Sequence, residues 1–143
     1  MSRSECAFCA LAADQGAATQ AVFRDEVAMA FLDHRPLFPG HLLVIPIAHV
    51  PTLPELPAEL VGPFFERVRR LTGAVERGTG ARGSFVAMNN RISQSVPHLH
   101  VHVVPRNPKD GLRGFFWPRT RYPDQAAAQR VAAAIRAALD SAS

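Results

Sequence analysis

Three histidines alternate with aliphatic residues in the second half of the chain. His98, His100 and His102 are separated by Leu99 and Val101. Neighbouring side chains of a β-strand point to opposite faces, so this spacing predicts three imidazoles on one face and the aliphatic side chains in the core. An imidazole can bind a metal or act as a nucleophile near neutral pH. The pattern therefore predicts a chemical site, in which either the three histidines bind a catalytic metal or one of them is a nucleophile.

The chain has two cysteines, Cys6 and Cys9, at C-x-x-C spacing. In a reducing compartment such a pair more often binds a metal or performs redox chemistry than forms a structural disulfide. The sequence around the pair gives no further support for redox chemistry. Metal binding is therefore the preferred interpretation, and two free buried thiols are the alternative.

Basic residues gather in the same stretch as the histidines. The formal net charge is +4 and the isoelectric point is near 10, which favours anionic partners without specifying a fold. A phosphate-bearing ligand would be electrostatically favoured there, and a solvated basic rim is the alternative. The basic residues of this stretch are Arg91, Arg106, Lys109, Arg113, Arg119 and Arg121.

The elements that position these residues follow from hydrophobic periodicity. Five strands are expected: a hairpin turning at Asp25-Glu26, a buried strand closed by Pro46, and two later strands. One long helix is expected around Phe64 to Val75, with Pro63 in its first turn and Gly73 weakening it by about 1 kcal/mol. The predicted strands cover 21–24, 27–32, 42–45, 84–88 and 99–104, and an alanine-rich helix covers 125–139, with Val131, Ile135, Ala138 and Leu139 on one face.

The order of these elements predicts an α+β fold. It has an antiparallel sheet of about five strands, one long amphipathic helix and a C-terminal helix. A length of 143 residues with 48% hydrophobic content suits one domain over 1–143, with the histidine motif at 98–104 and a tail and helix at 107–143. No apolar run approaches the ~20 residues of a membrane span, and the N-terminus lacks the apolar core of a secretory signal. We therefore expect a cytoplasmic protein without membrane contact.

The histidine motif, with the two aliphatic residues that follow it, resembles the signature of the histidine-triad family. Two flanking blocks strengthen the resemblance in order and spacing. The first contains Phe31-Leu32-Asp33, Pro36, the run 39–46 and His49, and the second contains Gln94-Ser95 before the triad. The resemblance covers the span from Cys6 to Pro105, and several separated motifs agree.

The resemblance implies a nucleotide hydrolase or transferase. In such an enzyme His100 attacks the α-phosphorus of a purine nucleotide, and water or another acceptor then resolves the nucleotidyl-histidine. The substrates it implies are dinucleoside polyphosphates or nucleoside phosphoramidates. The other ring nitrogen of His100 must donate to a fixed acceptor, for which we expect a backbone carbonyl near His49 or His41.

The remaining site residues are also assigned by similarity. His102 is expected to hydrogen-bond the phosphate or the bridging oxygen, beside the first triad residue, His98. Gln94 and Ser95 are expected to hold phosphate oxygens, and Asp33 the ribose hydroxyls. Val22, Phe23 and Phe31 are expected around the base, and Asn89 or Asn90 near the phosphate, in a loop shorter than the family pattern.

Members of the family with an N-terminal C-x-x-C bind zinc through it. The resemblance therefore implies a closed, structural zinc site formed by Cys6, Cys9, His49 and His98, which suits tetrahedral coordination. The aromatic and basic segment 112–119 corresponds to a region that varies with substrate, often at a two-fold interface. From this resemblance alone we expect a homodimer.

Three alternatives stay open at this stage. One is a non-catalytic nucleotide-binding or regulatory protein with the same fold, and another is a metal-dependent hydrolase that uses the histidine ladder as ligands. A zinc-finger nucleic-acid binder is less favoured, because its metal ligands would lie close in sequence and flank a recognition helix.

Overall fold

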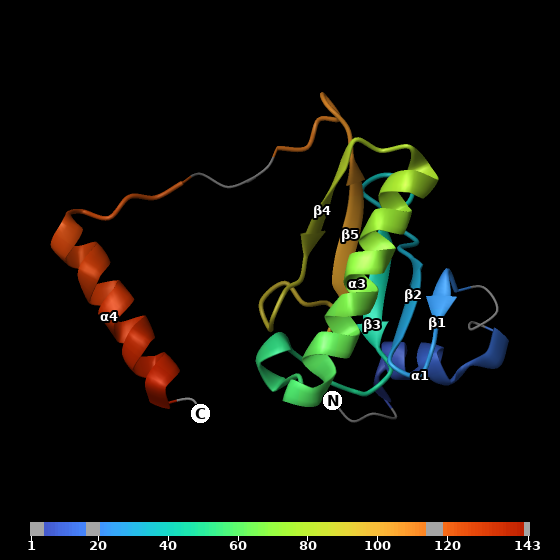
Figure 1. Ribbon diagram of the computed structural model, residues 1–143, viewed down its shortest axis with the longest axis horizontal. Coiled ribbons are helices and arrows are strands. Elements are labelled where there is room, and N and C mark those ends of the chain that lie inside the picture. The colour runs from blue at the N-terminus through green and yellow to red at the C-terminus, as the bar shows by residue number, and fades with distance from the viewer. Residues whose placement is uncertain (1–4, 17–20, 114–118, 142–143) are drawn as a thin grey trace. The chain divides into compact units, whose positions relative to one another are not determined.

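A computed structural model describes residues 5–16, 21–113 and 119–141 (Figure 1). The chain forms two compact units, Met1–Asp110 and Gly111–Ser143. The extent of the domain, expected over 1–143, stays a prediction. Most of the aromatic segment singled out in the sequence, residues 114–118, lies outside the described residues.

The first unit is built on a five-stranded antiparallel sheet in the order β1-β2-β3-β5-β4, as the α+β prediction requires. A hairpin joins the first two strands, and the Asp25 carboxylate accepts hydrogen bonds from the backbone N–H groups of Val27 and Ala28 in its turn. The strands are β1 (Phe23–Arg24), β2 (Ala28–Leu32), β3 (Leu42–Pro46), β4 (Gly83–Ala87) and β5 (Val101–Arg106).

The long helix α3 (Ala58–Thr79) covers one face of this sheet (Figure 1). Its apolar stripe is the predicted one: Phe64, Val68, Leu71 and Val75 are its buried residues. Each large apolar side chain buried in this way contributes about 1.5–3 kcal/mol. The helix ends at Gly80, whose φ of 70° is a left-handed conformation that glycine adopts without strain.

The start of α3 differs from the prediction. Pro63 lies in the second turn of the helix, which begins at Ala58 after Pro57. The missing N–H of Pro63 leaves the carbonyl of Glu59 without its usual partner, but Glu59 is exposed and water can solvate it. The Pro63 carbonyl itself accepts a hydrogen bond from Arg67 Nη1 at 2.9 Å.

A short helix, α1 (Ala7–Ala13), packs on the other face of the sheet. Ala12 of this helix is buried in a cluster with Met29 and Ile45, and Phe8 and Phe31 pack against the same cluster. Strand β3 is buried along its whole length because it lies between the two covered faces. A single turn of 3-10 helix, η2 (Leu53–Glu55), precedes α3.

Strand β5 begins two residues later than predicted. The apolar half of the alternation is confirmed, since Leu99, Val101 and Val103 are fully buried on the α3 side. His98 and His100, however, precede the strand and only His102 lies in it. Residues 98–100 lie outside the hydrogen-bond ladder between β3 and β5, because the N–H of Leu99 donates to the carbonyl of Val50, beyond the end of β3.

The second unit contains helix α4 (Gln125–Ser141), which confirms the predicted C-terminal helix. Asp124 caps its first turn by accepting a hydrogen bond from the N–H of Ala127 at 2.7 Å. Among the described residues, no helix combines the length and apolar character that crossing a membrane requires.

Candidate functional site

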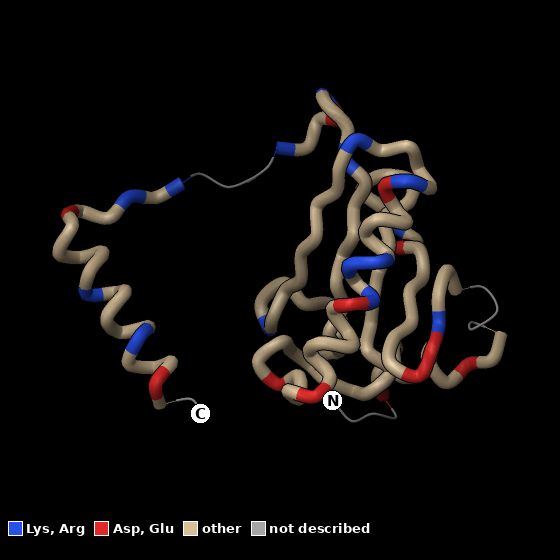
Figure 2. Tube along the Cα trace, viewed as in Figure 1, with Lys and Arg blue, Asp and Glu red and all other residues tan. Residues whose placement is uncertain are grey.

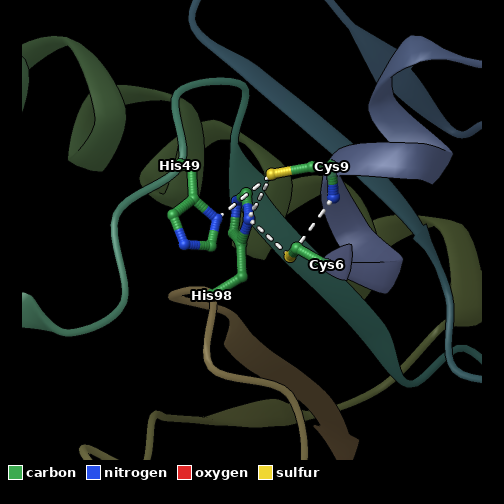
Figure 3. A group of neighbouring side chains, drawn as sticks. All are labelled: Cys6, Cys9, His49 and His98. Carbon is green, nitrogen blue, oxygen red and sulfur yellow. Dashed lines mark hydrogen bonds between the residues drawn. The ribbon is translucent and has the colours of Figure 1, made fainter. Parts of the chain in front are cut away.

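Two cysteines and two histidines converge beside the N-terminus of α1 (Figure 3). Their ligand atoms all lie within 4.8 Å of one another. Cys9 Sγ lies 3.1 Å from His49 Nδ1 and 3.4 Å from His98 Nδ1, and Cys6 Sγ lies 3.4 Å from His98 Nδ1. The structure thus brings together Cys6, Cys9, His49 and His98, the four residues implied as metal ligands.

Local structure fixes the orientation of this cluster. Cys6 is the N-cap of α1, and its sulfur accepts a hydrogen bond from the N–H of Cys9, so one turn of helix holds both thiols. His98 Nε2–H donates to the carbonyl of Pro46 at 2.8 Å, which leaves the Nδ1 lone pair directed at the sulfurs. Such an outer hydrogen bond is the usual way in which a metal-binding imidazole is oriented.

The donor set fits zinc. Two thiolates and two neutral imidazoles are a common tetrahedral zinc set, and four protein ligands leave no position for substrate. The four residues therefore form a candidate metal site of the closed, structural kind.

The imidazole of His100 is buried and held by the backbone. Its Nδ1–H donates to the carbonyl of His98 at 2.8 Å. The expected acceptor near His49 or His41 was therefore wrong, because the backbone turns before β5 and brings the His98 carbonyl to the ring. This bond places the proton on Nδ1 and leaves the lone pair of His100 on Nε2.

A chain of hydrogen bonds sets the proton positions on His102. The backbone N–H of Leu37 donates to His41 Nδ1 at 3.0 Å, so His41 carries its proton on Nε2. The Nε2 atom of His41 lies 2.9 Å from His102 Nδ1 and 3.6 Å from a carboxylate oxygen of Asp33. His102 Nδ1 is therefore an acceptor, and in the neutral ring the remaining proton is on Nε2.

Burial and neighbouring histidines keep His102 uncharged. Burial contributes most to lowering the pKa of His102, the charges of His100 and His41 lower it further, and Asp33 opposes them in part, which gives a value of about 4. Burial likewise lowers the pKa of His41, again opposed by Asp33. At neutral pH both rings are neutral, so His102 offers an N–H donor and no positive charge.

Phe8 is a site residue that the sequence patterns did not identify. Its ring meets the edge of His100 at a centroid distance of 5.1 Å and that of Phe31 at 5.6 Å. The available signal was its place between Cys6 and Cys9, two residues expected beside His98, and its ring does lie 6.0 Å from that of His98. The pairing of His41 with His102 was missed as well, because it joins segments 61 positions apart.

The aromatic residues expected around the base separate onto two faces of the sheet. Phe31 lies on the histidine face, since it pairs across the sheet with Leu43, which in turn pairs with His102. Phe23 faces α3 instead, and Val22 lines the same side. Of the three residues expected around the base, Phe31 is the one that the structure places on the face of His102.

The loop before the triad is braced by its own polar side chains. The Gln94 amide donates to the carbonyl of Pro51 at 2.6 Å and accepts from the N–H of Arg91 at 2.9 Å. Asn89 donates to the Ser93 carbonyl, whereas Asn90 accepts from the N–H of Leu53 in η2. Ser95 is exposed in this loop. The two asparagines thus differ in role, since Asn90 ties the loop to η2.

Two non-glycine residues of this short loop have positive φ angles. Arg91 has a φ of 71° and Ser93 a φ of 58°. Arg91, one of the basic residues near the histidines, pairs with Glu55 at 3.1 Å.

Comparison with proteins of known sequence relates the chain to several enzymes. It is 30% identical over 112 residues to an adenylylsulfatase of Arabidopsis thaliana, a match that covers 77% of this chain and 56% of the relative. It is 37% identical over 95 residues to a bis(5'-nucleosyl)-tetraphosphatase of Schizosaccharomyces pombe, covering 64% of this chain and 52% of the relative. The chain therefore spans about half the length of each of these two enzymes.

Solved structures share the fold over nearly the whole chain. A HIT family protein from Bacillus subtilis superposes with a TM-score of 0.79 at 31% identity, covering 92% of this chain and 95% of that one. A zinc-bound histidine triad family protein from Mycobacterium smegmatis gives a TM-score of 0.68 at 35% identity, covering 99% and 100%. Residues 15–109 match the model of the HIT domain, which is most of the chain. The protein belongs to the HIT family.

Proposed function

We propose that this protein is a nucleotide hydrolase or transferase that acts on nucleoside phosphoramidates or dinucleoside polyphosphates through a nucleotidyl-histidine on His100. The observation that carries the proposal is the hydrogen bond from His100 Nδ1 to the His98 carbonyl. It fixes the tautomer whose Nε2 lone pair is nucleophilic. The names of relatives, an adenylylsulfatase and two dinucleoside polyphosphate hydrolases, support the reaction class.

The reaction proceeds in two displacements. In the first, His100 Nε2 forms a bond to the α-phosphorus while the bond from phosphorus to the leaving nitrogen or oxygen breaks, and the leaving group keeps the electron pair. In the second, water or another acceptor forms a bond to the same phosphorus while the bond from phosphorus to His100 Nε2 breaks. The imidazole recovers its lone pair, and the proton of the attacking group passes to solvent. His102 Nε2–H donates a hydrogen bond to the leaving atom, where negative charge develops.

The nucleotide-binding residues of the proposal are assigned by the family resemblance. Phe31 packs against the base and Asp33 accepts hydrogen bonds from the ribose hydroxyls. Phosphate oxygens are held by Asn89, Gln94 and Ser95. To do so, Gln94 gives up one of the hydrogen bonds that its side-chain amide forms within the loop. The catalytic residues in this proposal are His98, His100 and His102, of which His98 acts through its carbonyl.

The metal and the assembly belong to the same proposal. Cys6, Cys9, His49 and His98 would hold a structural zinc ion, which would fix α1 against the segment before β5. The protein acts as a homodimer, a state inferred from the family resemblance.

The proposal is tested by rapid-quench incubation with an α-³²P-labelled adenosine phosphoramidate and, separately, with a labelled diadenosine polyphosphate. Acid-labile, base-stable label is expected on the wild type and absent from His100→Ala. His34→Ala is the matched control, because His34 is the exposed histidine outside both clusters. It should be labelled like the wild type.

A metal-dependent hydrolase is the second candidate, and one observation favours it. Ligand atoms of Asp33, His41 and His102 lie within 4.8 Å of one another and form a second possible metal group. The three triad histidines do not converge in this way, because His98 turns to the cysteines. Turnover without label on the protein, lost on chelation, would support this candidate, and absence of both would support a binding protein.

A further inference from the structure

An arginine-lined hollow lies between β1 and α3, on the face of the sheet opposite the histidines. Its volume is about 490 Å³, within the range of small-molecule sites. Four of its lining residues are arginines of α3, and Phe23 contributes the facing wall. We call this hollow the arginine groove, defined by Phe23, Arg67, Arg69, Arg70 and Arg77.

The sequence of α3 creates the groove by combining long and small side chains. Arg70, Ala74 and Arg77 recur at helical spacing on the side of α3 that faces β1. Gly73 and Ala74 leave space between the two guanidiniums. A Cβ atom on Gly73 would lie 2.9 Å from Arg77 Nη1. The Arg77 side chain therefore folds back towards Gly73 and occupies the space beside it.

The positive charge of the groove is only partly compensated. Arg67 pairs with Asp25 at 2.9 Å, and Arg69 pairs with Glu66 at 2.6 Å. Among the described residues, neither Arg70 nor Arg77 forms an ion pair with a carboxylate, although the charge of Arg70 contributes to lowering the pKa of Glu66. No acidic residue lines the groove. Figure 2 shows basic positions in blue along α3, together with acidic positions in red.

Phe23 orients the Arg70 guanidinium. The Arg70 guanidinium carbon lies over the Phe23 ring, 5.7 Å from its centroid. A guanidinium stacked on an aromatic ring keeps its N–H groups available at the edge, where they can bind phosphate with two parallel hydrogen bonds. Arg70 is therefore preorganised to bind an oxyanion.

A smaller apolar hollow continues from the groove. It has a volume of about 140 Å³ and shares Val22, Leu71 and Ala74 with the groove. A ligand that occupies both spaces must carry an anionic group at one end and a compact apolar group at the other.

We propose that the arginine groove binds a small phosphate-bearing molecule, with its phosphate on Arg70 and Arg77 and its apolar part against Val22 and Leu71. This site is separate from the nucleophile, because the groove lies on the α3 face and His100 lies on the α1 face. The proposal does not depend on the chemistry assigned to His100.

Amide NMR of the full chain at low ionic strength tests the proposal, with phenyl phosphate and inorganic phosphate as probes. We expect phenyl phosphate to shift the amides of Val22 and residues 70–77, and inorganic phosphate to bind the same place more weakly. Arg70→Gln combined with Arg77→Gln should weaken binding at least tenfold. Arg136→Gln, which removes one charge from α4, should leave it unchanged.

A second variant separates shape from charge. Ala74→Leu fills the space between the arginines without altering charge, and leucine is a good helix former, so α3 should fold normally. We expect it to abolish the groove shifts. Groove shifts that persist in Ala74→Leu, or an equal loss in Arg136→Gln, would overturn the proposal. Shifts that arise only with a single-stranded oligonucleotide would also overturn it and assign the groove to nucleic acid.

Discussion

Replacing Gly40 by alanine tests how closely α3 approaches the segment that carries His41. Gly40 has a φ of 101°, a conformation that residues with a Cβ atom rarely adopt. An ideal Cβ at this position would lie 2.5 Å from Cγ2 of Thr79, in the last turn of α3. Gly40→Ala therefore introduces both backbone strain and a steric clash.

The expected cost follows from these two contributions. Forcing a residue with a Cβ atom into positive φ costs about 1–2 kcal/mol. Inserting a methyl group against a neighbour that cannot move freely costs about 1–2 kcal/mol more, because the Thr79 side chain is held by its hydroxyl on the Val75 carbonyl at 2.7 Å. We expect Gly40→Ala to lower the free energy of unfolding by roughly 2–4 kcal/mol.

The clash can be removed without altering the hydrogen bond. Thr79→Ser deletes Cγ2 and keeps the hydroxyl, so the double variant Gly40→Ala/Thr79→Ser should regain about 1–2 kcal/mol, whereas Thr79→Ser alone should have little effect. Urea titration followed by the NMR amide signals of β3 and β5 measures the first unit without the signal of α4. The midpoint of Gly40→Ala should fall by about 1–2 M, for a slope near 2 kcal/mol/M.

Two results would refute this reasoning. If Gly40→Ala unfolds at the midpoint of the wild type, the positive φ at this position carries no cost. If the double variant is no more stable than Gly40→Ala, Thr79 is not the residue that a Cβ at Gly40 meets.

Two further predictions concern the clusters. Protein expressed with zinc should contain about one zinc ion per chain and lose thermal stability on chelation. Cys9→Ser should lose both the bound zinc and the effect of the chelator on stability. A wild-type protein found free of metal by elemental analysis would contradict the proposed zinc site. Because the pKa of His102 is lowered to about 4, the unfolded state binds more protons than the folded state between pH 6.5 and 4, and stability falls as the pH falls through this range. His102→Gln should reduce the fall in melting temperature between pH 7 and 4.5, to which His41, whose pKa is also lowered, still contributes. An unchanged slope would argue against a half-buried His102 that is neutral in the folded protein.

Features governed by local periodicity were predictable from the sequence. The apolar stripe of α3 repeats at helical spacing, and Leu99, Val101 and Val103 alternate as a half-buried strand must. Both patterns depend on burial and not on hydrogen bonding. Leu99 therefore follows the alternation although it precedes the regular part of β5. The candidate metal ligands were named from the family resemblance, because nothing in their spacing joins the N-terminus to His98.

Features that depend on register and on long-range contact were not predictable. Phe23 and Phe31 both precede the buried strand, and their faces are decided by which residues pair in the β1–β2 hairpin. The observed register pairs Phe23 with Ala30, which faces α3, so Phe23 shares that face while Phe31 takes the opposite one. A shift of one residue in the pairing of β1 with β2 would turn Phe23 to the histidine face. The sequence does not reveal the register of so short a strand.

The position of His98 connects the candidate metal site to His100, the proposed nucleophile. Its ring faces the cysteines through Nδ1, and its carbonyl accepts the Nδ1 proton of His100. A metal held by the ring therefore fixes the peptide group that sets the tautomer of His100, although four protein ligands exclude substrate from the metal itself. Loss of the metal would loosen that carbonyl and lower activity without removing any group that contacts the nucleotide. A decrease in turnover on chelation is thus compatible with a structural zinc ion, and only trapping of label on His100 separates this effect from metal-dependent chemistry.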